Sequence, residues 1–225
     1  MRAMLLAAGR GERLRPITDT LPKPLVEVAG KSLIVYQLEA LARAGIVEVV
    51  INLSWLGERI RAALGDGSRY GVRITYSEEG PVPLEAGGGI QRALPFLGEA
   101  PFLVVNSDIW IDLDFSRFTS WNDAADAHLV LAPNPPHHPR GDFGLEGDVV
   151  VERAVDRFTY TGVGVYRPQL FEGSSPGKFP LLPLLKRAIA ARRLRGEVHR
   201  GEWLDIGSPD RLAALDARER GARSR

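Results

Sequence analysis

The chain has 225 residues, a length that fits one large α/β domain or two small ones and can bury a substantial core. Its formal net charge of +1 gives no electrostatic footprint for nucleic acid, and the absence of cysteine excludes a disulfide framework and thiolate metal sites. The first apolar run is too short to span a membrane and lacks signal-peptide features, so a cytoplasmic protein without a membrane partner is expected. The basic segment 218–225 is interpreted as a solvated tail.

The N-terminal segment combines an apolar run, a glycine loop and spaced cations. Residues 3–8 are typical of a buried strand in a parallel sheet, and Gly9 and Gly11 follow at once. Arg13 comes next, and Lys23 lies between two prolines, which predict a stiff, extended support. Backbone N–H groups and guanidinium groups both suit a polyphosphate. An ordinary tight turn also uses Gly-x-Gly, so the phosphate site is a hypothesis at this point.

A dinucleotide site is not predicted from this loop. Leu14 stands where the third glycine of the Rossmann fingerprint would be, and Pro16 interrupts the helix that should begin there. The following strand ends at Ile51-Asn52-Leu53, without the acidic residue that holds a ribose.

Strands and helices alternate in the first half of the chain. Ser32 is predicted to cap a helix that ends at Gly45. The other expected elements are a strand at 25–28, a strand at 47–53, a helix at 55–64 and a strand at 72–76. This alternation implies right-handed crossovers and a parallel sheet.

Two segments that follow are predicted to face the same end of this sheet. Residues 77–89 are rich in glycine and are expected to form a loop before a helix at 90–97, although a hinge or linker has a similar composition. A buried strand at 101–105 then ends in Asn106-Ser107-Asp108. Because ligands of open α/β sheets bind beyond the carboxyl ends of strands, Asp108 is well placed to hold a cation.

The second half is expected to form short strands and two helices. The strands at 128–132, 142–145, 149–151 and 158–166 predict a smaller lid or second layer over the sheet. They are followed by a helix at 181–194, a strand at 196–200 and a final helix capped at Ser208. The fold class is therefore α/β, with a Rossmann-like, mixed and mostly parallel sheet flanked by helices, in one domain over 1–225 whose halves are 1–110 and 111–225.

Asp108 and Asp205 each end an apolar strand. Turn or capping roles are common for aspartate, but two such carboxylates also suit one Mg²⁺ that takes its remaining ligands from phosphate and water. His137 and His138 lie in a proline-rich loop and are interpreted as solvated. No nucleophile elbow is visible, so covalent hydrolysis has no support.

These motifs together resemble a known family. Leu6-Ala-Ala-Gly-Arg-Gly-Glu-Arg-Leu-Arg-Pro-Ile-Thr18 with Pro22-Lys-Pro-Leu25 resembles the signature of the sugar-nucleotidyltransferases, which couple a nucleoside triphosphate to a sugar 1-phosphate and release pyrophosphate. The segments 83–90, 106–108 and 203–209 resemble the base-reading loop and the two metal aspartates of that family. Within it, the chain is most similar to the N-acetylmuramate 1-phosphate uridylyltransferases of cell-wall recycling.

The resemblance implies roles for individual residues. Arg13 and Lys23 are the expected catalytic cations, and Asp108 and Asp205 would bind Mg²⁺. The residues implied for the nucleotide are Gly9, Gly11, Glu12, Arg13, Lys23, Glu79, Glu85 and Gly88, and those for the sugar are Asn106, Asp142, Gly144, Thr161 and Gly162. Glu85 and Ser107 depart from the family pattern, because glycine is usual at both positions. A glycine at position 107 is compatible with a positive φ, which a serine adopts only rarely.

The implied reaction needs no general base, because the sugar phosphate is already ionised and attacks the α-phosphorus in line. The expected partners are a nucleoside triphosphate and a sugar 1-phosphate, with the chain as a monomer or weak homodimer. Alternatives are a glucose 1-phosphate thymidylyl- or uridylyltransferase and a mannose 1-phosphate guanylyltransferase. A catalytically silent nucleotide-sugar sensor is the alternative from another class.

Overall fold

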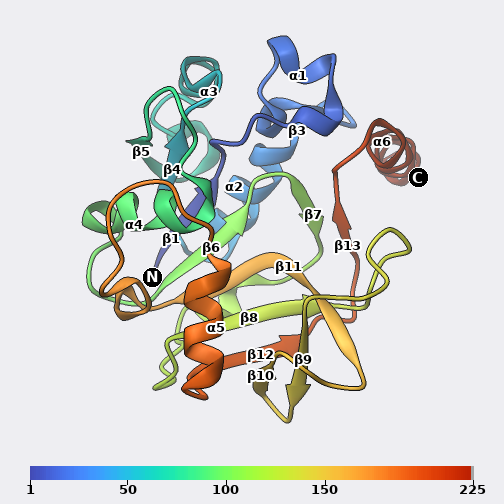
Figure 1. The fold of residues 1–225 in the computed structure, drawn as a ribbon. Coiled ribbons are helices and arrows are strands. Elements are labelled where there is room, and N and C mark those ends of the chain that lie inside the picture. The colour runs from blue at the N-terminus through green and yellow to red at the C-terminus, as the bar shows by residue number, and fades with distance from the viewer. Residues whose placement is uncertain (224–225) are drawn as a thin grey trace.

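The computed structural model describes residues 1–223 and is built around one mixed sheet of nine strands (Figure 1). The strands lie in the order β5-β4-β1-β6-β11-β8-β12-β10-β9. Their bounds are Arg2–Leu6 for β1, Glu48–Leu53 for β4, Arg73–Glu78 for β5, Phe102–Asn106 for β6, Ala127–Ala132 for β8, Phe143–Glu146 for β9, Val149–Val151 for β10, Arg157–Tyr166 for β11 and Leu194–Val198 for β12. The predicted α/β fold with a mixed sheet is confirmed.

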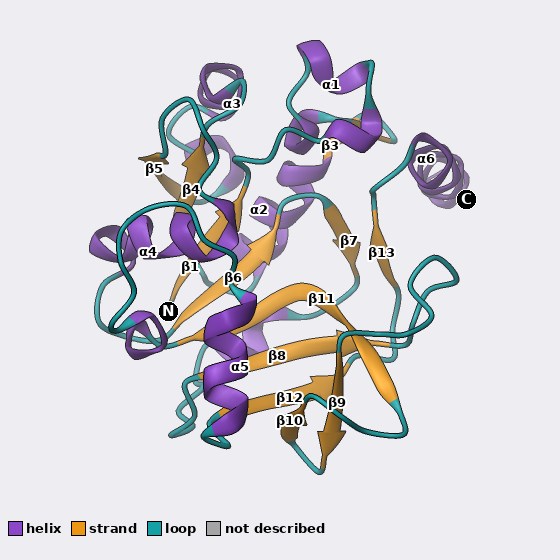
Figure 2. Cartoon of the chain, viewed as in Figure 1, coloured by secondary structure: helices purple, strands orange, loops and turns teal. Residues whose placement is uncertain are grey.

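Helices cover both faces of the sheet (Figure 2). They are α2 (Leu33–Arg43), α3 (Gly57–Leu64), α4 (Glu85–Leu97) and α5 (Leu182–Ala190). Alternate residues of a strand point to opposite faces, so Ala3 and Leu5 of β1 pack with α2 and α3, whereas Met4 packs with α4 and α5. These three strand residues are fully buried, which explains the continuous apolar run in β1.

The strands of the second half do not form a separate lid or layer, and that prediction is wrong. β11 pairs antiparallel with β6, and β8, β12, β10 and β9 continue the same sheet beyond it. Strands β5, β4, β1 and β6 are parallel, as the alternation of the first half predicts. β11 pairs with β6 near its carboxyl end, with β8 along most of its length and with β9 near its start, because it is ten residues long. It is irregular between Tyr160 and Val163, where its register with β8 shifts.

The glycines of segment 77–89 belong largely to helix α4, so the prediction of a loop there is wrong from Glu85 onward. A Cβ built on Gly87 would lie 2.6 Å from the Phe179 ring, and one on Gly88 would lie 2.1 Å from the carbonyl oxygen of Gly177. The glycines therefore allow residues 177–180 to approach the helix closely, and they do not provide a hinge.

Smaller elements surround the carboxyl ends of the parallel strands. They are α1 (Ile17–Thr20), the hairpin of β2 (Glu27–Val28) and β3 (Lys31–Ser32), the pair β7 (Ile109–Ile111) and β13 (Trp203–Asp205), and α6 (Pro209–Arg223). Ile206 and Leu215 are buried with apolar residues of the β2–β3 region, which places α6 over that hairpin. None of the helices within residues 1–223 is long and apolar enough to cross a membrane.

Several predicted boundaries are corrected. α5 ends at Ala190 and β12 begins at Leu194, because Arg192 has a positive φ that ends the helix before the strand. Lys23 begins a 3-10 turn rather than an extended segment. α6 is helical to Arg223, so most of the expected tail is ordered helix, and residues 224–225 lie outside the described residues.

Candidate active site

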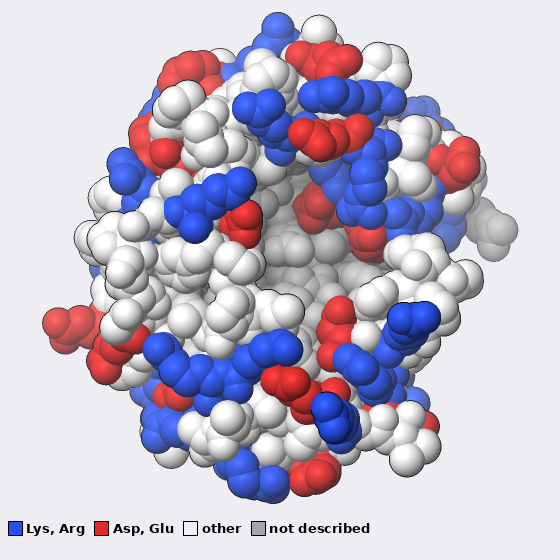
Figure 3. Space-filling model, in the orientation of Figure 1, with Lys and Arg blue, Asp and Glu red and all other residues white. Residues whose placement is uncertain are grey.

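Three adjoining cavities open at the carboxyl ends of β1 and β6, and Asn106 lines all three. The loop cavity, about 560 Å³, lies between residues 6–14 and α4. The aspartate cavity, about 420 Å³, contains Asp108 and Asp205, and the helix cavity, about 620 Å³, lies against α5. Figure 3 shows a hollow in this face, with acidic side chains inside it and lysine and arginine side chains at its border.

The loop cavity is shaped by the glycine loop after β1. Gly11 has φ +64°, and a Cβ there would lie 2.9 Å from Cγ2 of Thr18, so the position requires glycine. The Thr18 hydroxyl donates to the carbonyl oxygen of Gly11 at 2.8 Å and fixes the turn. The predicted residues Gly9, Gly11, Glu12, Arg13 and Lys23 all line this cavity.

Lys23 forms an ion pair with Asp108 at the floor of the loop cavity. The Lys23 side chain is 9% exposed and that of Asp108 is 31% exposed. A buried ammonium group requires a nearby negative charge, so the pair fixes both side chains where the loop and aspartate cavities meet.

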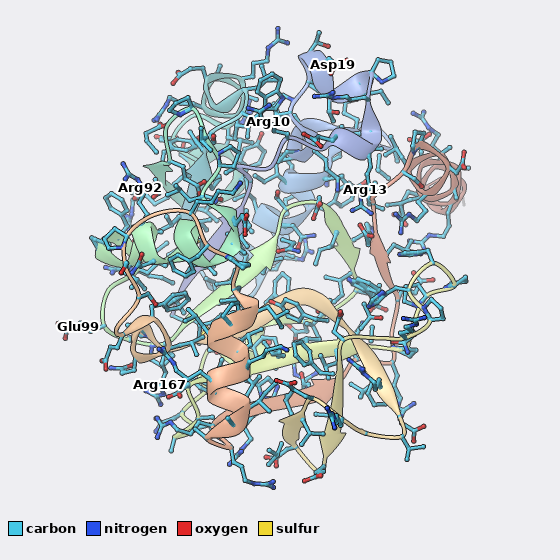
Figure 4. All side chains as sticks on the ribbon, in the orientation of Figure 1. Arg10, Arg13, Asp19, Arg92, Glu99 and Arg167 are labelled. Carbon is cyan, nitrogen blue, oxygen red and sulfur yellow. The ribbon has the colours of Figure 1, made fainter. Side chains whose placement is uncertain are left out.

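Pairing of β7 with β13 brings the two predicted aspartates together. Asp205 lies opposite Ile109, the residue after Asp108, and the Ile206 N–H donates to the Asp108 carbonyl oxygen at 3.1 Å. Arg13 lines the loop and aspartate cavities, and its guanidinium group lies beside Gly207. Figure 4 shows Arg13 on the α6 side of the loop.

Asp205 is balanced by a cation that sequence reasoning did not single out. Arg211 Nη1 lies 3.1 Å from Asp205 Oδ2, and His137 Nε2 lies 3.6 Å from the same oxygen. Burial and the nearby Arg211 guanidinium lower the pKa of His137, so its ring is neutral at pH 7 and Arg211 is the compensating charge. The Arg211–Asp205 ion pair could not be predicted from the sequence, because it depends on how the turn between β13 and α6 orients the helix.

Glu79 is buried at the far wall of the loop cavity and accepts two hydrogen bonds. Its Oε1 accepts from Asn52 Nδ2 at 2.6 Å, and its Oε2 accepts from the Leu84 N–H at 2.7 Å. Asn52 Oδ1 in turn accepts from the Ala7 N–H at 2.7 Å. Burial raises the pKa of Glu79, and the two hydrogen bonds oppose that shift. The network links β1, β4 and the start of α4 in one wall of the cavity. Asn52 was not among the predicted site residues, although its position near the end of β4 is a signal that could have identified it.

The substitution Glu79→Gln is expected to lower the free energy of unfolding by about 1–3 kcal/mol, because a carboxamide has only one oxygen and leaves one buried donor unpaired. Urea denaturation at pH 7 measures the change. Glu78→Gln is the matched control, since Glu78 is 52% exposed and pairs with Arg61 at the surface, where loss of the pair costs about 0–1 kcal/mol. Equal effects of the two substitutions would contradict the role of the buried network.

Glu85 and Gly88 differ in their relation to the loop cavity. Glu85 lines it and has φ +61°, a left-handed conformation that a non-glycine residue adopts at a cost of about 1–3 kcal/mol. Gly88 lines none of the three cavities, and its N–H donates to the Phe179 carbonyl oxygen at 3.1 Å. Ser107, the other departure from the family pattern, is not among the described residues with a positive φ, and its hydroxyl donates to the Leu6 carbonyl oxygen at 2.5 Å.

The predicted sugar residues surround the irregular part of β11. Asn106, Asp142 and Thr161 line the aspartate cavity, and Gly162 packs against the Asn106 side chain. Gly144 lies against Ala154 and lines none of the three cavities. Tyr160 and Trp203 also line the aspartate cavity, and the Trp203 indole donates to the Thr161 carbonyl oxygen at 2.9 Å.

Known proteins resemble this chain over most of its length. The family model described as "Nucleotidyl transferase" matches residues 2–159. The N-acetylmuramate alpha-1-phosphate uridylyltransferase of Neisseria meningitidis is 50% identical over 96% of this chain and 97% of its own. The protein of the same name from Caulobacter vibrioides is 37% identical over 96% of each chain.

A solved structure supports the fold. The putative glucose-1-phosphate thymidylyltransferase of Bacillus anthracis superposes with a TM-score of 0.85 over 98% of this chain and 95% of its own, at 20% sequence identity.

Proposed function

The chain belongs to the nucleotidyl transferase family, and on that premise we propose that it transfers UMP from UTP to N-acetylmuramic acid 1-phosphate, which gives the UDP-sugar and pyrophosphate. The observation that carries the proposal is the 50% identity over nearly the whole chain to a relative named for that reaction. The reaction fits a cytoplasmic route that recycles cell-wall sugars.

The loop cavity is the proposed nucleotide site. The triphosphate would lie along Gly9, Gly11 and Glu12, within reach of Arg13 and Lys23. The base would lie against the start of α4, where Glu85 lines the cavity and the buried Glu79 holds Leu84 in place. Gly88 would act by letting residues 177–180 pack against that helix, because its N–H already has a partner.

Asp108 and Asp205 are the proposed ligands of Mg²⁺. The Asp108 and Asp205 side chains are 31% and 23% exposed. Asp108 directly precedes β7 and Asp205 ends β13, and because these strands pair, both aspartates line the aspartate cavity. Among residues 1–223, no three histidine, aspartate or glutamate side chains are grouped so that they could hold a metal ion together. Two carboxylates fit Mg²⁺, which commonly takes one or two from the protein and the rest from phosphate and water. When bound, the ion would neutralise developing charge on the phosphates.

The residues of the chain then position and neutralise the reactants. The sugar would lie in the aspartate cavity against Asn106, Asp142, Thr161 and Gly162, with its phosphate toward Arg13. A phosphate oxygen attacks the α-phosphorus of UTP, a new P–O bond forms, and the bond to the β-phosphate oxygen breaks to release pyrophosphate. Arg13 and Lys23 would stabilise the charge that develops during this displacement.

The substitution Arg13→Ala is expected to lower kcat by about 10²-fold or more, on the scale of losing one preorganised charge-stabilising group. Steady-state kinetics with UTP and the sugar phosphate varied in turn measure the effect. A rise in KM with kcat unchanged would make Arg13 a binding residue only. Arg59→Ala is the control, because Arg59 is an exposed arginine of α3 that lines none of the three cavities.

The function is tested by a matrix of the four common nucleoside triphosphates against several sugar 1-phosphates, with pyrophosphate release measured in the presence of Mg²⁺. Highest turnover is expected for UTP with N-acetylmuramic acid 1-phosphate. Preference for a glucose or mannose phosphate would replace the proposed substrate and retain the reaction class. No turnover with any pair would favour a nucleotide-sugar sensor.

A further inference from the structure

The helix cavity adjoins the proposed sugar site and has an apolar floor. Val104, Phe143 and Leu185 line it and are each at most 4% exposed. It shares Asp142 and Tyr160 with the aspartate cavity, so a substituent of a sugar held there can extend into it. The Tyr160 hydroxyl is already bonded to that of Tyr166 at 2.7 Å, so Tyr160 presents its ring.

Cations line the mouth of the helix cavity. They are Arg153, Arg157 and Lys186. Lys186 Nζ lies 3.6 Å from Glu152, and Arg157 donates to the Asp142 carbonyl oxygen at 2.5 Å, which uses one of its five N–H groups. Arg153 has no hydrogen bond or ion pair with any residue in 1–223. Figure 3 shows basic side chains along the border of the hollow over α5.

The carboxylates beside these cations are already engaged. Asp142 Oδ2 accepts from the Tyr160 N–H at 2.8 Å, and its Oδ1 lies 3.0 Å from His138 Nε2. Glu152 pairs with Lys186. The two arginines are therefore available to an anion that enters the cavity from the sugar site, and guanidinium groups bind carboxylates in a bidentate geometry.

We propose that the helix cavity selects the sugar, with Arg153 and Arg157 binding a carboxylate carried by a substituent of the sugar ring. This inference rests on the proposed function. N-acetylmuramic acid differs from N-acetylglucosamine by an O-lactyl group, which has one methyl group and one carboxylate that is ionised at pH 7. The apolar floor suits the methyl group and the arginines suit the carboxylate. Arg153 and Arg157 are specificity residues and take no part in the displacement at phosphorus.

The test compares kcat/KM for three acceptors at saturating UTP. They are N-acetylmuramic acid 1-phosphate, its neutral lactyl amide, and N-acetylglucosamine 1-phosphate. The wild type should prefer the acid over both neutral acceptors. In R153Q and R157Q, kcat/KM for the acid should fall about 10- to 100-fold more than for the neutral acceptors, as expected for loss of a hydrogen bond to a charged group.

Controls separate charge from folding and from the proposed function. R153K should retain most of the preference, and R59Q, an exposed arginine of α3 that lines none of the cavities, should leave it unchanged. Thermal unfolding checks that each variant is folded. A double variant R153Q/R157Q that keeps the preference for the acid overturns the inference alone. A wild type that turns over other sugar 1-phosphates but not N-acetylmuramic acid 1-phosphate overturns the proposed function, and the inference with it.

Discussion

Replacing Asp108 or Asp205 with Asn is expected to lower kcat by at least about 10³-fold, because each substitution removes one of two carboxylates proposed to hold Mg²⁺ at the phosphates. Asp108→Asn has a second effect, since it leaves the Lys23 ammonium, 9% exposed, without its counterion. Its unfolding free energy should therefore fall more than that of Asp205→Asn, whose partner Arg211 is 23% exposed.

The measurements are pyrophosphate release, urea denaturation and binding of Mn²⁺, as a paramagnetic substitute, in the presence of UTP. Asp112→Asn is the matched control: Asp112 lies four residues from Asp108, pairs with His199 at 2.6 Å and lines none of the three cavities. Near-normal turnover by either Asp108→Asn or Asp205→Asn, with the fold intact, would show that the metal assignment is wrong.

The substitution Lys23→Met is expected to lower kcat about 10²- to 10³-fold with the protein still folded. The methionine fills the buried space of the lysine stem but carries no charge toward the phosphates. Asp108 is 31% exposed, so its carboxylate stays hydrated when Lys23 is removed, and the stability loss should be small. Mn²⁺ binding should persist in Lys23→Met and be lost in Asp108→Asn, which separates a charge-stabilising role from a metal-holding one.

Lys31→Met provides the control for this substitution. Lys31 also forms an ion pair, with Glu39 at 2.6 Å, and its side chain is 30% exposed, but it lies on β3 and lines none of the cavities. It should change kcat by less than about twofold, because it lies outside the cavities that hold the reactants. Its effect on stability should also be small, because exposed and half-exposed ion pairs contribute little. If Lys23→Met raises KM for UTP and leaves kcat unchanged, Lys23 only binds the nucleotide.

The local elements of this protein were largely readable from its sequence. The apolar run of β1, the helix α2 that follows Ser32 and the β-branched run of β4 are short-range patterns, and the structure contains all three elements. Ser32 occupies the N-cap position of α2, but its side chain makes no capping hydrogen bond, so the predicted cap is wrong in that respect. The glycine-rich start of α4 is the exception, since a loop was predicted there. Its glycines leave space for Phe179 and Gly177, which are about ninety residues away in the chain. Glycine composition alone does not distinguish a flexible loop from a helix that must be approached closely.

The candidate site shows the same division. Local patterns were enough to predict phosphate and metal chemistry, from a glycine loop, two cations and two strand-end aspartates. The pairing of β7 with β13, which brings Asp205 beside Asp108, and the ion pair of Lys23 with Asp108 could not be predicted in this way. The same is true of Arg211 beside Asp205 and of the arginines of the helix cavity. Side-chain pairing depends on strand register and on packing between distant segments, which local patterns do not encode.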